Sequence, residues 1–140
     1  QKDKLSLNLM HCNVDRCNPN SRHKLTQDSV EVAVHPRFGK LKFRSGHFIV
    51  LEVKLKQGVR RSAFSIVRSE RNGIIIGVKK NGDHGISAWL NSIKQPAKAS
   101  LAGPFGQFHV NPAADKHIFI TGGSGITPVR SMFDELLAKG

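Results

Sequence analysis

The sequence predicts a mainly β protein: an antiparallel barrel with one short helix, followed by the first β-α unit of a truncated α/β domain. Three observations predict this. Short runs of alternating apolar and polar residues recur after residue 25, turns rich in glycine and asparagine separate them, and an apolar run near the C-terminus leads into a glycine-rich turn and a helix signal. We therefore expect a linker or the end of a preceding module over 1–24, the barrel over 25–111 and the incomplete unit over 112–140.

Period-two alternation places the elements of the barrel in order. No such alternation is evident over 1–24, whereas it predicts four longer strands from residue 30 onward. Gln57-Gly58 and Asn72-Gly73 are typical hairpin turns. The expected elements are strands over 30–34, 47–55, 60–67 and 73–79, a helix over 87–94, and short strands over 99–102 and 108–110 on either side of a Gly103-Pro-Phe-Gly106 turn.

Residues 116–128 carry the strongest local signal. Ile118–Ile120 predicts a strand, and a helix is expected directly after the glycine-rich turn, with Thr127 as N-cap and Pro128 in its first position. Glycines without a Cβ let backbone N–H groups approach a ligand closely, and the helix N-terminus favours negative charge. Such a strand–turn–helix suits a phosphate or the edge of a planar cofactor.

The composition limits the possible partners. The formal net charge is +12, which attracts anions such as nucleic acid, a dinucleotide phosphate, an acidic protein or a membrane surface, although a merely solvated basic surface explains it equally well. No apolar run approaches the ~20 residues of a membrane helix, so no membrane insertion is expected. The basic residues form no run of five or more, which weakens the case for nucleic acid.

The cysteines and histidines predict no metal site. Cys12 and Cys17 have only the first half of a plant-type [2Fe–2S] spacing, because Asn20 stands where the third ligand would fall and the chain holds 2 cysteines in all. We expect two reduced thiols, which fits a reducing, cytoplasmic compartment. The 7 histidines show no tight ligand spacing.

Two segments could hold an anionic, aromatic ligand. Arg60–Ser65 combines guanidinium groups, an aromatic ring and hydroxyls on one strand, and Gly82–Ser87, preceded by Lys79 and Lys80, offers backbone N–H groups and a hydroxyl at a helix start. Taken alone, the first segment is more simply explained as a strand with Phe64 in the core, and the second as a common loop-to-helix junction.

Taken in order, these segments resemble the ferredoxin–NADP reductase superfamily from about Lys24 to the end of the chain. The last of the matching segments is the most specific, because it follows the family's G-G-[TS]-G-I-T-P signature, whereas the others are short. The matching segments are 43–49 (F-x-P-G-[QH]-[FY], with Ser45 in place of proline), 61–65 (R-x-[YF]-S), 85–90 (G-x-S-x-[WY]-L), 103–108 (G-P-x-G-x-F) and 121–128.

The resemblance implies a six-stranded antiparallel Greek-key barrel that binds FAD, with FMN as a narrower alternative. Phe64 would lie against the isoalloxazine and Ser65 near its N5, Arg61 would neutralise the phosphates, and Lys79, Gly85, Ile86, Ser87 and Thr127 would complete the flavin site. Gly122, Gly123, Ser124 and Gly125 would approach the junction of flavin and nicotinamide. The family arginine stands two positions before the aromatic residue, where this chain has Ser62. Either a one-residue bulge brings Arg61 into its place, or the phosphate contact is weakened; we favour Arg61, because a bulge can re-aim its side chain.

Two functions of different class follow. The first is the flavin-binding part of an NAD(P)H-dependent oxidoreductase, a fragment incomplete for full turnover, that passes electrons to an acidic ferredoxin or to a covalently linked [2Fe–2S] domain outside this chain. Such chemistry requires no catalytic acid or base, and we expect none. The alternative is a non-enzymatic basic barrel that binds nucleic acid or an acidic protein. This alternative gives the glycine-rich βα turn no role.

Overall fold

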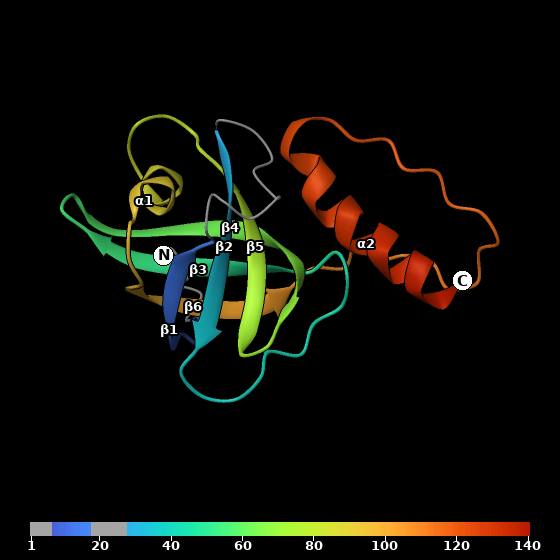
Figure 1. Ribbon diagram of the computed structural model, residues 1–140, viewed down its shortest axis with the longest axis horizontal. Helices are drawn as coiled ribbons and strands as arrows, with labels where there is room; N and C mark the ends of the chain where they lie inside the picture. The colour runs from blue at the N-terminus through green and yellow to red at the C-terminus, as the bar shows by residue number, and fades with distance from the viewer. Residues whose placement is uncertain (1–6, 18–27) are drawn as a thin grey trace, which may run out of the picture.

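In the computed structural model, which describes residues 7–17 and 28–140, six antiparallel strands close into a barrel (Figure 1). Their order around the barrel is β1-β2-β5-β4-β3-β6, so the six-stranded antiparallel barrel is confirmed. The strands are β1 (Met10–Arg16), β2 (Ser29–Pro36), β3 (Phe48–Leu55), β4 (Gly58–Glu70), β5 (Gly73–Lys79) and β6 (Ala97–Phe105); the helices are α1 (Ile86–Ser92), a 3-10 turn η1 (Gly123–Gly125) and α2 (Ile126–Lys139).

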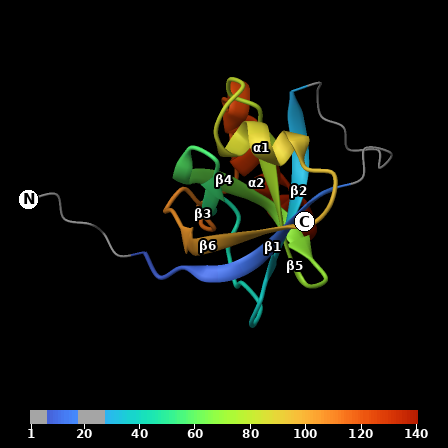
Figure 2. The ribbon, with the colours of Figure 1, turned by 90° about the vertical axis from the view of Figure 1, so that its left-hand side faces the viewer.

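The barrel interior is the main hydrophobic core. Alternate residues of each strand point inward, as on β3, where Ile49, Leu51 and Val53 are buried and their neighbours are not fully buried. Burial of branched aliphatic side chains contributes about 1.5–3 kcal/mol each, which explains why strands rich in valine and isoleucine form this closed sheet. Ile86 and Leu90 of α1 belong to the same buried cluster, so α1 covers one opening of the barrel (Figure 2).

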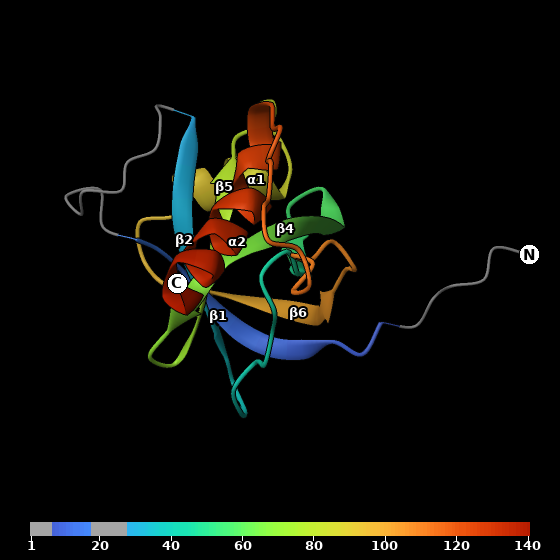
Figure 3. The same ribbon diagram turned by 90° about the vertical axis from the view of Figure 1, so that its right-hand side faces the viewer.

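Helix α2 lies on the outside of the barrel against β4 (Figure 3). Its inner face buries Val129, Ser131 and Met132, whereas Phe133 and Leu137 on its outer face are more than half exposed. Ser45 donates a hydrogen bond to the Glu135 carboxylate, which joins the β2–β3 connection to this helix. The first turn of α2 also approaches the barrel, because a Cβ at Gly77 of β5 would lie 2.9 Å from Thr127 Cγ2.

The prediction of a linker or the end of a preceding module over residues 1–24 is wrong for Met10–Arg16, and residues 1–6 and 18–24 lie outside the described residues. This segment is strand β1, and it closes the barrel by pairing with β2 on one side and β6 on the other. Only Cys12 and Val14 of this strand are fully buried. Two inward positions among polar neighbours are too few for a clear alternation, so the strand depends on partners distant in the sequence.

Two other predicted strands are absent from the described residues. Residues 108–110 form no strand, and β6 runs through Gly103-Pro104 to Phe105 instead of ending at 102. Residues 118–120 also form none, and Ile118 and Ile120 are 89% and 94% exposed. A strand of a parallel sheet needs neighbouring strands on which to form its ladder, and the described residues supply none there. The following helix is confirmed, although Gly125 rather than Thr127 is its N-cap residue.

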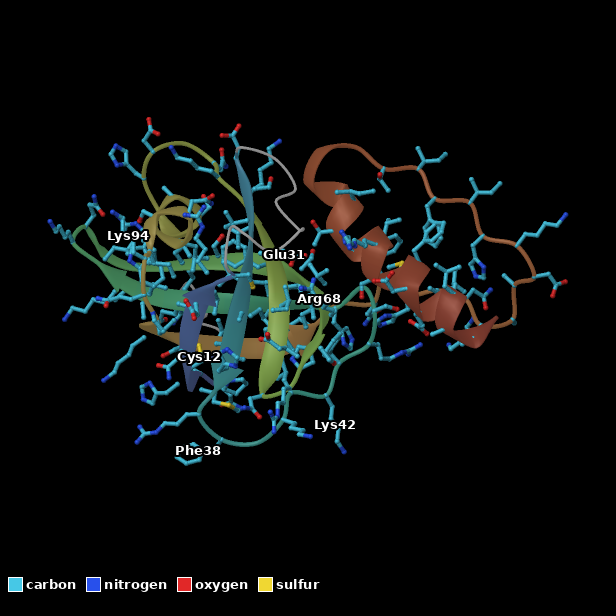
Figure 4. The ribbon with its side chains drawn as sticks, in the orientation of Figure 1. Cys12, Glu31, Phe38, Lys42, Arg68 and Lys94 are labelled. Atoms are coloured by element: carbon cyan, nitrogen blue, oxygen red, sulfur yellow. The ribbon has the colours of Figure 1, made fainter. Side chains whose placement is uncertain are left out.

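A buried ion pair ties β2 to β4 on the outer face of the barrel. Arg68 donates to both carboxylate oxygens of Glu31, each at 2.8 Å, and Figure 4 shows the two side chains next to each other. The Glu31 side chain is 2% exposed and that of Arg68 39%. This hydrogen bonding to Glu31 raises the pKa of Arg68.

No helix in the described part of the chain is both long and apolar enough to cross a bilayer.

Candidate flavin site

One cleft of about 600 Å³ lies between β4, the loop that connects β5 to α1, and the N-terminal end of α2. Figure 1 shows that loop and the start of α2 on the same side of the barrel. A cleft of this size is in the range of small-molecule sites. Eight of the residues predicted to bind flavin line it: Arg61, Phe64, Ser65, Lys79, Gly85, Ile86, Ser87 and Thr127; its other lining residues are Arg60, Ser62, Ala63, Gly77, Lys80, Asn81 and His84.

Phe64 and Ser65 on β4 form one wall of the cleft. Phe64 is 8% exposed, because most of its ring packs into the barrel core, and Ser65 is partly exposed on the opposite face of the strand. Both residues border the cleft even though neighbouring side chains of a strand point to opposite faces. Immediately after these two residues, the pairing of β4 with β5 is irregular between Ile66 and Arg68. Such bulges increase the local twist of a strand.

Four basic side chains, Arg60, Arg61, Lys79 and Lys80, line the same cleft. Two of them already have carboxylate partners: Arg61 Nε lies 2.6 Å from Glu52 Oε2, and Lys80 Nζ lies 2.8 Å from Asp83 Oδ1. In the described ranges 7–17 and 28–140, Arg60 and Lys79 form no ion pair. The cleft is therefore positively charged, with two cations left for an anionic ligand.

The predicted bulge at Arg61 is wrong. The pairing of β3 with β4 is regular from Phe48 opposite Ser65 to Leu55 opposite Gly58, and Arg61 stands directly opposite Glu52. Arg61 reaches the edge of the cleft from the outer face of the sheet. Arg60 stands opposite the buried Val53 and so shares a strand face with Ser62, the position of the family arginine. The arginine nearest in orientation to the expected one is thus Arg60.

The start of α1 supplies hydroxyl and backbone groups. Ser87 Oγ accepts a hydrogen bond from the Asn81 N–H at 3.0 Å, which leaves its own O–H free to donate to a ligand. Gly85, the N-cap residue, has φ +93°, a conformation that L side chains rarely adopt. No side chain caps this first turn. An anion beside Ser87 would find donors that the protein itself does not use.

The structure shows Gly77 as a further cleft residue that the sequence reasoning did not predict. A Cβ at Gly77 would lie 2.9 Å from Cγ2 and 3.3 Å from Oγ1 of Thr127, so only glycine lets α2 approach β5 this closely. The signal available in the sequence was a glycine inside an otherwise apolar strand, which often marks close approach of another segment.

The glycine-rich turn is placed outside the cleft. Gly122, Gly123 and Gly125 are exposed, and Ser124 belongs to the same 3-10 turn, η1. None of the three glycines lines the cleft, whereas Thr127, two residues further on, does. The structure therefore brings the predicted flavin residues together but not the residues predicted for the flavin–nicotinamide junction, which remain a prediction.

Both cysteines are free thiols. Burial raises the pKa of Cys12 to about 12, and burial together with Glu31 raises the pKa of Cys17, so neither is an activated thiolate. Among residues 7–17 and 28–140, no three His, Cys, Asp or Glu side chains gather as metal ligands would.

Comparison with known proteins gives sequence relatives that include subunits of oxygenases. The chain is 36% identical over 104 residues to the phenoxybenzoate dioxygenase subunit beta of Ectopseudomonas oleovorans, which covers 71% of this chain and 32% of that protein. It is 35% identical over 94 residues to the glycine betaine monooxygenase reductase subunit of Pseudomonas aeruginosa, covering 64% of this chain and 26% of that subunit. The chain thus spans about a third or less of these relatives. No family model matches it.

Solved structures share the fold. Phthalate dioxygenase reductase, described as a modular structure for electron transfer from pyridine nucleotides to [2Fe-2S], superposes with a TM-score of 0.74 at 22% identity, covering 95% of this chain and 41% of that one. Ferredoxin-NADP+ reductase from Plasmodium falciparum superposes with a TM-score of 0.69 at 23% identity, covering 94% and 52%.

The barrel with its helix-capped opening and its cleft therefore defines an FAD/NAD-binding reductase fold. The chain thus has the fold of ferredoxin–NADP reductases and is similar in sequence to part of an oxygenase reductase subunit.

Proposed function

We propose that this chain is the flavin-binding part of an NAD(P)H-dependent oxidoreductase. The observation that carries the proposal is the convergence of Arg61, Phe64, Ser65 and Ser87, from separate segments, on one cationic cleft. Relatives that are reductase components of oxygenases support the same conclusion. The alternative of a basic barrel that binds nucleic acid or an acidic protein finds no support among the relatives.

The residues present fit a flavin nucleotide. The aromatic edge of Phe64 and the Ser65 hydroxyl suit a flat heterocycle with hydrogen-bonding ring atoms. Arg60, Arg61, Lys79 and the Ser87 hydroxyl suit phosphate oxygens, because guanidinium and ammonium groups form charge-assisted hydrogen bonds with them. When bound, a flavin accepts a hydride from a nicotinamide and releases electrons singly. The protein's part is to hold and orient the coenzyme, and the cleft requires no catalytic acid or base for that.

The partners follow from the same proposal. NAD(P)H would supply the hydride, and an acidic ferredoxin or a linked [2Fe–2S] domain would accept the electrons, because a net charge of +12 favours docking of an acidic surface. Phthalate dioxygenase reductase, which shares this fold and is described as transferring electrons from pyridine nucleotides to [2Fe-2S], supports this assignment. A cytoplasmic location stays a prediction.

A binding experiment tests the proposal. The purified chain is mixed with FAD or FMN, passed over a gel-filtration column and scanned for the flavin absorbance band near ~450 nm. We expect flavin to co-elute with the wild type and with Lys98→Glu, and to be lost in Lys79→Glu, because Lys79 lines the cleft and Lys98 lines a separate cavity. A colourless wild-type protein would refute the proposed function.

A further inference from the structure

The chain contains two Asn-Gly dipeptides, at 72–73 and at 81–82. In such a dipeptide the backbone nitrogen of glycine can attack the side-chain amide carbon of asparagine, because glycine has no Cβ to hinder the approach. A C–N bond forms, ammonia leaves, and water opens the resulting succinimide to aspartate or isoaspartate. The product carries one more negative charge than the asparagine. The reaction requires an accessible amide and a glycine whose backbone can rotate into position.

The dipeptide at 72–73 is held in place by the sheet. Gly73 is the first residue of β5 and pairs with Glu70 of β4. On its other side, a Cβ added to Gly73 would overlap the carbonyl oxygen of Val34 in β2. The glycine backbone therefore lies between two strands. Attack on the Asn72 amide requires this end of the hairpin to open first, and such local opening costs free energy.

The dipeptide at 81–82 has the opposite surroundings. Asn81 and Gly82 are exposed and belong to the loop that connects β5 to α1. Gly82 has nothing within 4 Å of an added Cβ, and its N–H donates no hydrogen bond within the described ranges. The side-chain amide of Asn81 has no hydrogen-bond partner among the described residues either, since only its backbone N–H is bonded, to Ser87 Oγ at 3.0 Å. The Gly82 nitrogen is therefore free to approach the Asn81 amide carbon.

The position of Asn81 gives the reaction a consequence. Asn81 lines the flavin cleft, whereas Asn72 does not. A carboxylate at position 81 would directly follow Lys80 in the chain and would share the cleft with Lys79. It would attract these ammonium groups and repel the phosphates of a ligand. Loss of one side-chain amide would thus cancel part of the positive charge that suits the cleft to an anion.

We propose that Asn81 is a deamidation site, at which the chain converts an amide of the flavin cleft into a carboxylate without an enzyme and thereby weakens its own binding of the coenzyme. The modification itself is independent of the proposed function, whereas its effect on flavin binding rests on that function. Asn72 has the same dipeptide in a paired hairpin and is the internal comparison.

Peptide mapping measures the modification. The purified chain is kept at mildly alkaline pH, either native or unfolded in guanidinium chloride, and is digested with trypsin at successive times. The two dipeptides fall in separate tryptic peptides, 72–79 and 81–94. Fragment spectra distinguish Asn81 from Asn91, whose amide donates a hydrogen bond to a backbone carbonyl of α1 at 2.9 Å. Because each hydrogen bond broken on opening slows a reaction roughly tenfold, native Asn81 should deamidate at least about tenfold faster than native Asn72, and the unfolded rates should agree within about threefold.

Flavin titration measures the consequence, with FMN and FAD as probes. Asn81→Asp reproduces the new charge, and Asn72→Asp adds the same charge outside the cleft. Asn81→Asp should bind flavin about fivefold more weakly than wild type, and Asn72→Asp should bind it within about twofold of wild type. Circular dichroism melts establish that both variants are folded. Wild-type chain aged until Asn81 is converted replaces Asn81→Asp if that variant does not fold.

The outcomes separate this inference from the proposed function. Faster native loss of Asn81, together with weaker flavin binding by Asn81→Asp alone, supports the inference. Equal native rates at the two sites, or faster loss at Asn72, overturn the assigned modification site. Unchanged flavin affinity in Asn81→Asp overturns the consequence while the flavin site stands. Binding of no flavin by any form refutes the proposed function, and the mapped rates still decide whether Asn81 is the modification site.

Discussion

Arg61 of β4 and Glu52 of β3 form an ion pair at one cross-strand position, with 2.6 Å between Nε and Oε2. The Arg61 side chain is 49% exposed and also lines the cleft. Its Nε is occupied by Glu52, but a guanidinium carries further N–H donors, so Arg61 can face a carboxylate and a ligand phosphate together. Glu52 thereby holds the guanidinium at the edge of the cleft.

Replacing Arg61 by alanine should weaken flavin binding by about 1 kcal/mol, below the ~1.5–3 kcal/mol of a buried charged hydrogen bond, because water screens this exposed group. Fluorescence titration measures the change, and Arg71→Ala, an exposed arginine outside the cleft, is the matched control. Full affinity in Arg61→Ala together with a loss in Arg60→Ala would transfer the phosphate contact to Arg60.

Removing Arg68 should destabilise the fold, because it leaves the buried Glu31 carboxylate without its bidentate partner. Breaking a buried pair costs about 3–5 kcal/mol, and since the Arg68 side chain is 39% exposed we expect about 2 kcal/mol for Arg68→Ala. Urea denaturation gives the free energy of unfolding. Arg71→Ala should change it by less than about 0.5 kcal/mol; equal losses in the two variants would contradict the assigned role of the pair.

Gly46 should tolerate no side chain. A Cβ there would overlap the Phe108 carbonyl oxygen and lie 2.7 Å from Met132 Cε, and its φ is +89°. Gly82 has a similar φ of +70° with nothing within 4 Å of an added Cβ, so Gly82→Ala isolates the cost of the backbone conformation. We expect about 1 kcal/mol for Gly82→Ala and about 3 kcal/mol or more for Gly46→Ala in thermal or urea unfolding. Similar values for both would show that α2 does not pack on this segment.

The contact between His47 and His109 should make stability depend on pH. His47 Nδ1 accepts the Arg44 N–H at 2.9 Å, and the His109 ring centroid lies 4.7 Å away. Burial, followed by the charges of His109 and Arg44, lowers the pKa of His47 below its usual 6.5. The fold therefore favours neutral His47: its stabilisation is complete above pH 6.5 and is lost as the pH falls through the lowered pKa.

His47→Asn tests this dependence, because its amide oxygen can still accept a hydrogen bond but does not titrate. Unfolding free energies measured from pH 5 to pH 8 should converge for wild type and variant at the acid end and diverge in favour of wild type towards neutrality. Curves that stay parallel would assign the pH dependence to other groups.

Local patterning explains which elements were predictable. Strands β3 and β5 alternate clearly or carry unbroken isoleucine runs, and both were predicted from the residues that form them. Strand β1 was missed because only Cys12 and Val14 are fully buried and its pairing partners lie distant in the sequence. The apolar run at 118–120 resembles a strand, but a strand also requires neighbours, which local sequence cannot supply.

The candidate site likewise contains residues that local sequence predicted and residues that it did not. Phe64, Ser65 and Ser87 were found because their segments match motifs in a fixed order. Gly77 was not, since its place in the cleft depends on how closely α2 approaches β5, which is a matter of packing between distant segments. The bulge expected at Arg61 was wrong because motif spacing says nothing of strand register, which the β3–β4 ladder sets.

The central claim, that the cleft holds a flavin, is tested most directly by amide chemical shifts of the ¹⁵N-labelled chain during titration with FAD. We predict that the largest changes fall on Ser65, Lys79, Gly85, Ser87 and Thr127, with little change at Arg37 and Lys98 in the separate cavity. Shifts confined to that other cavity, or no saturable shifts at any residue, would contradict the account.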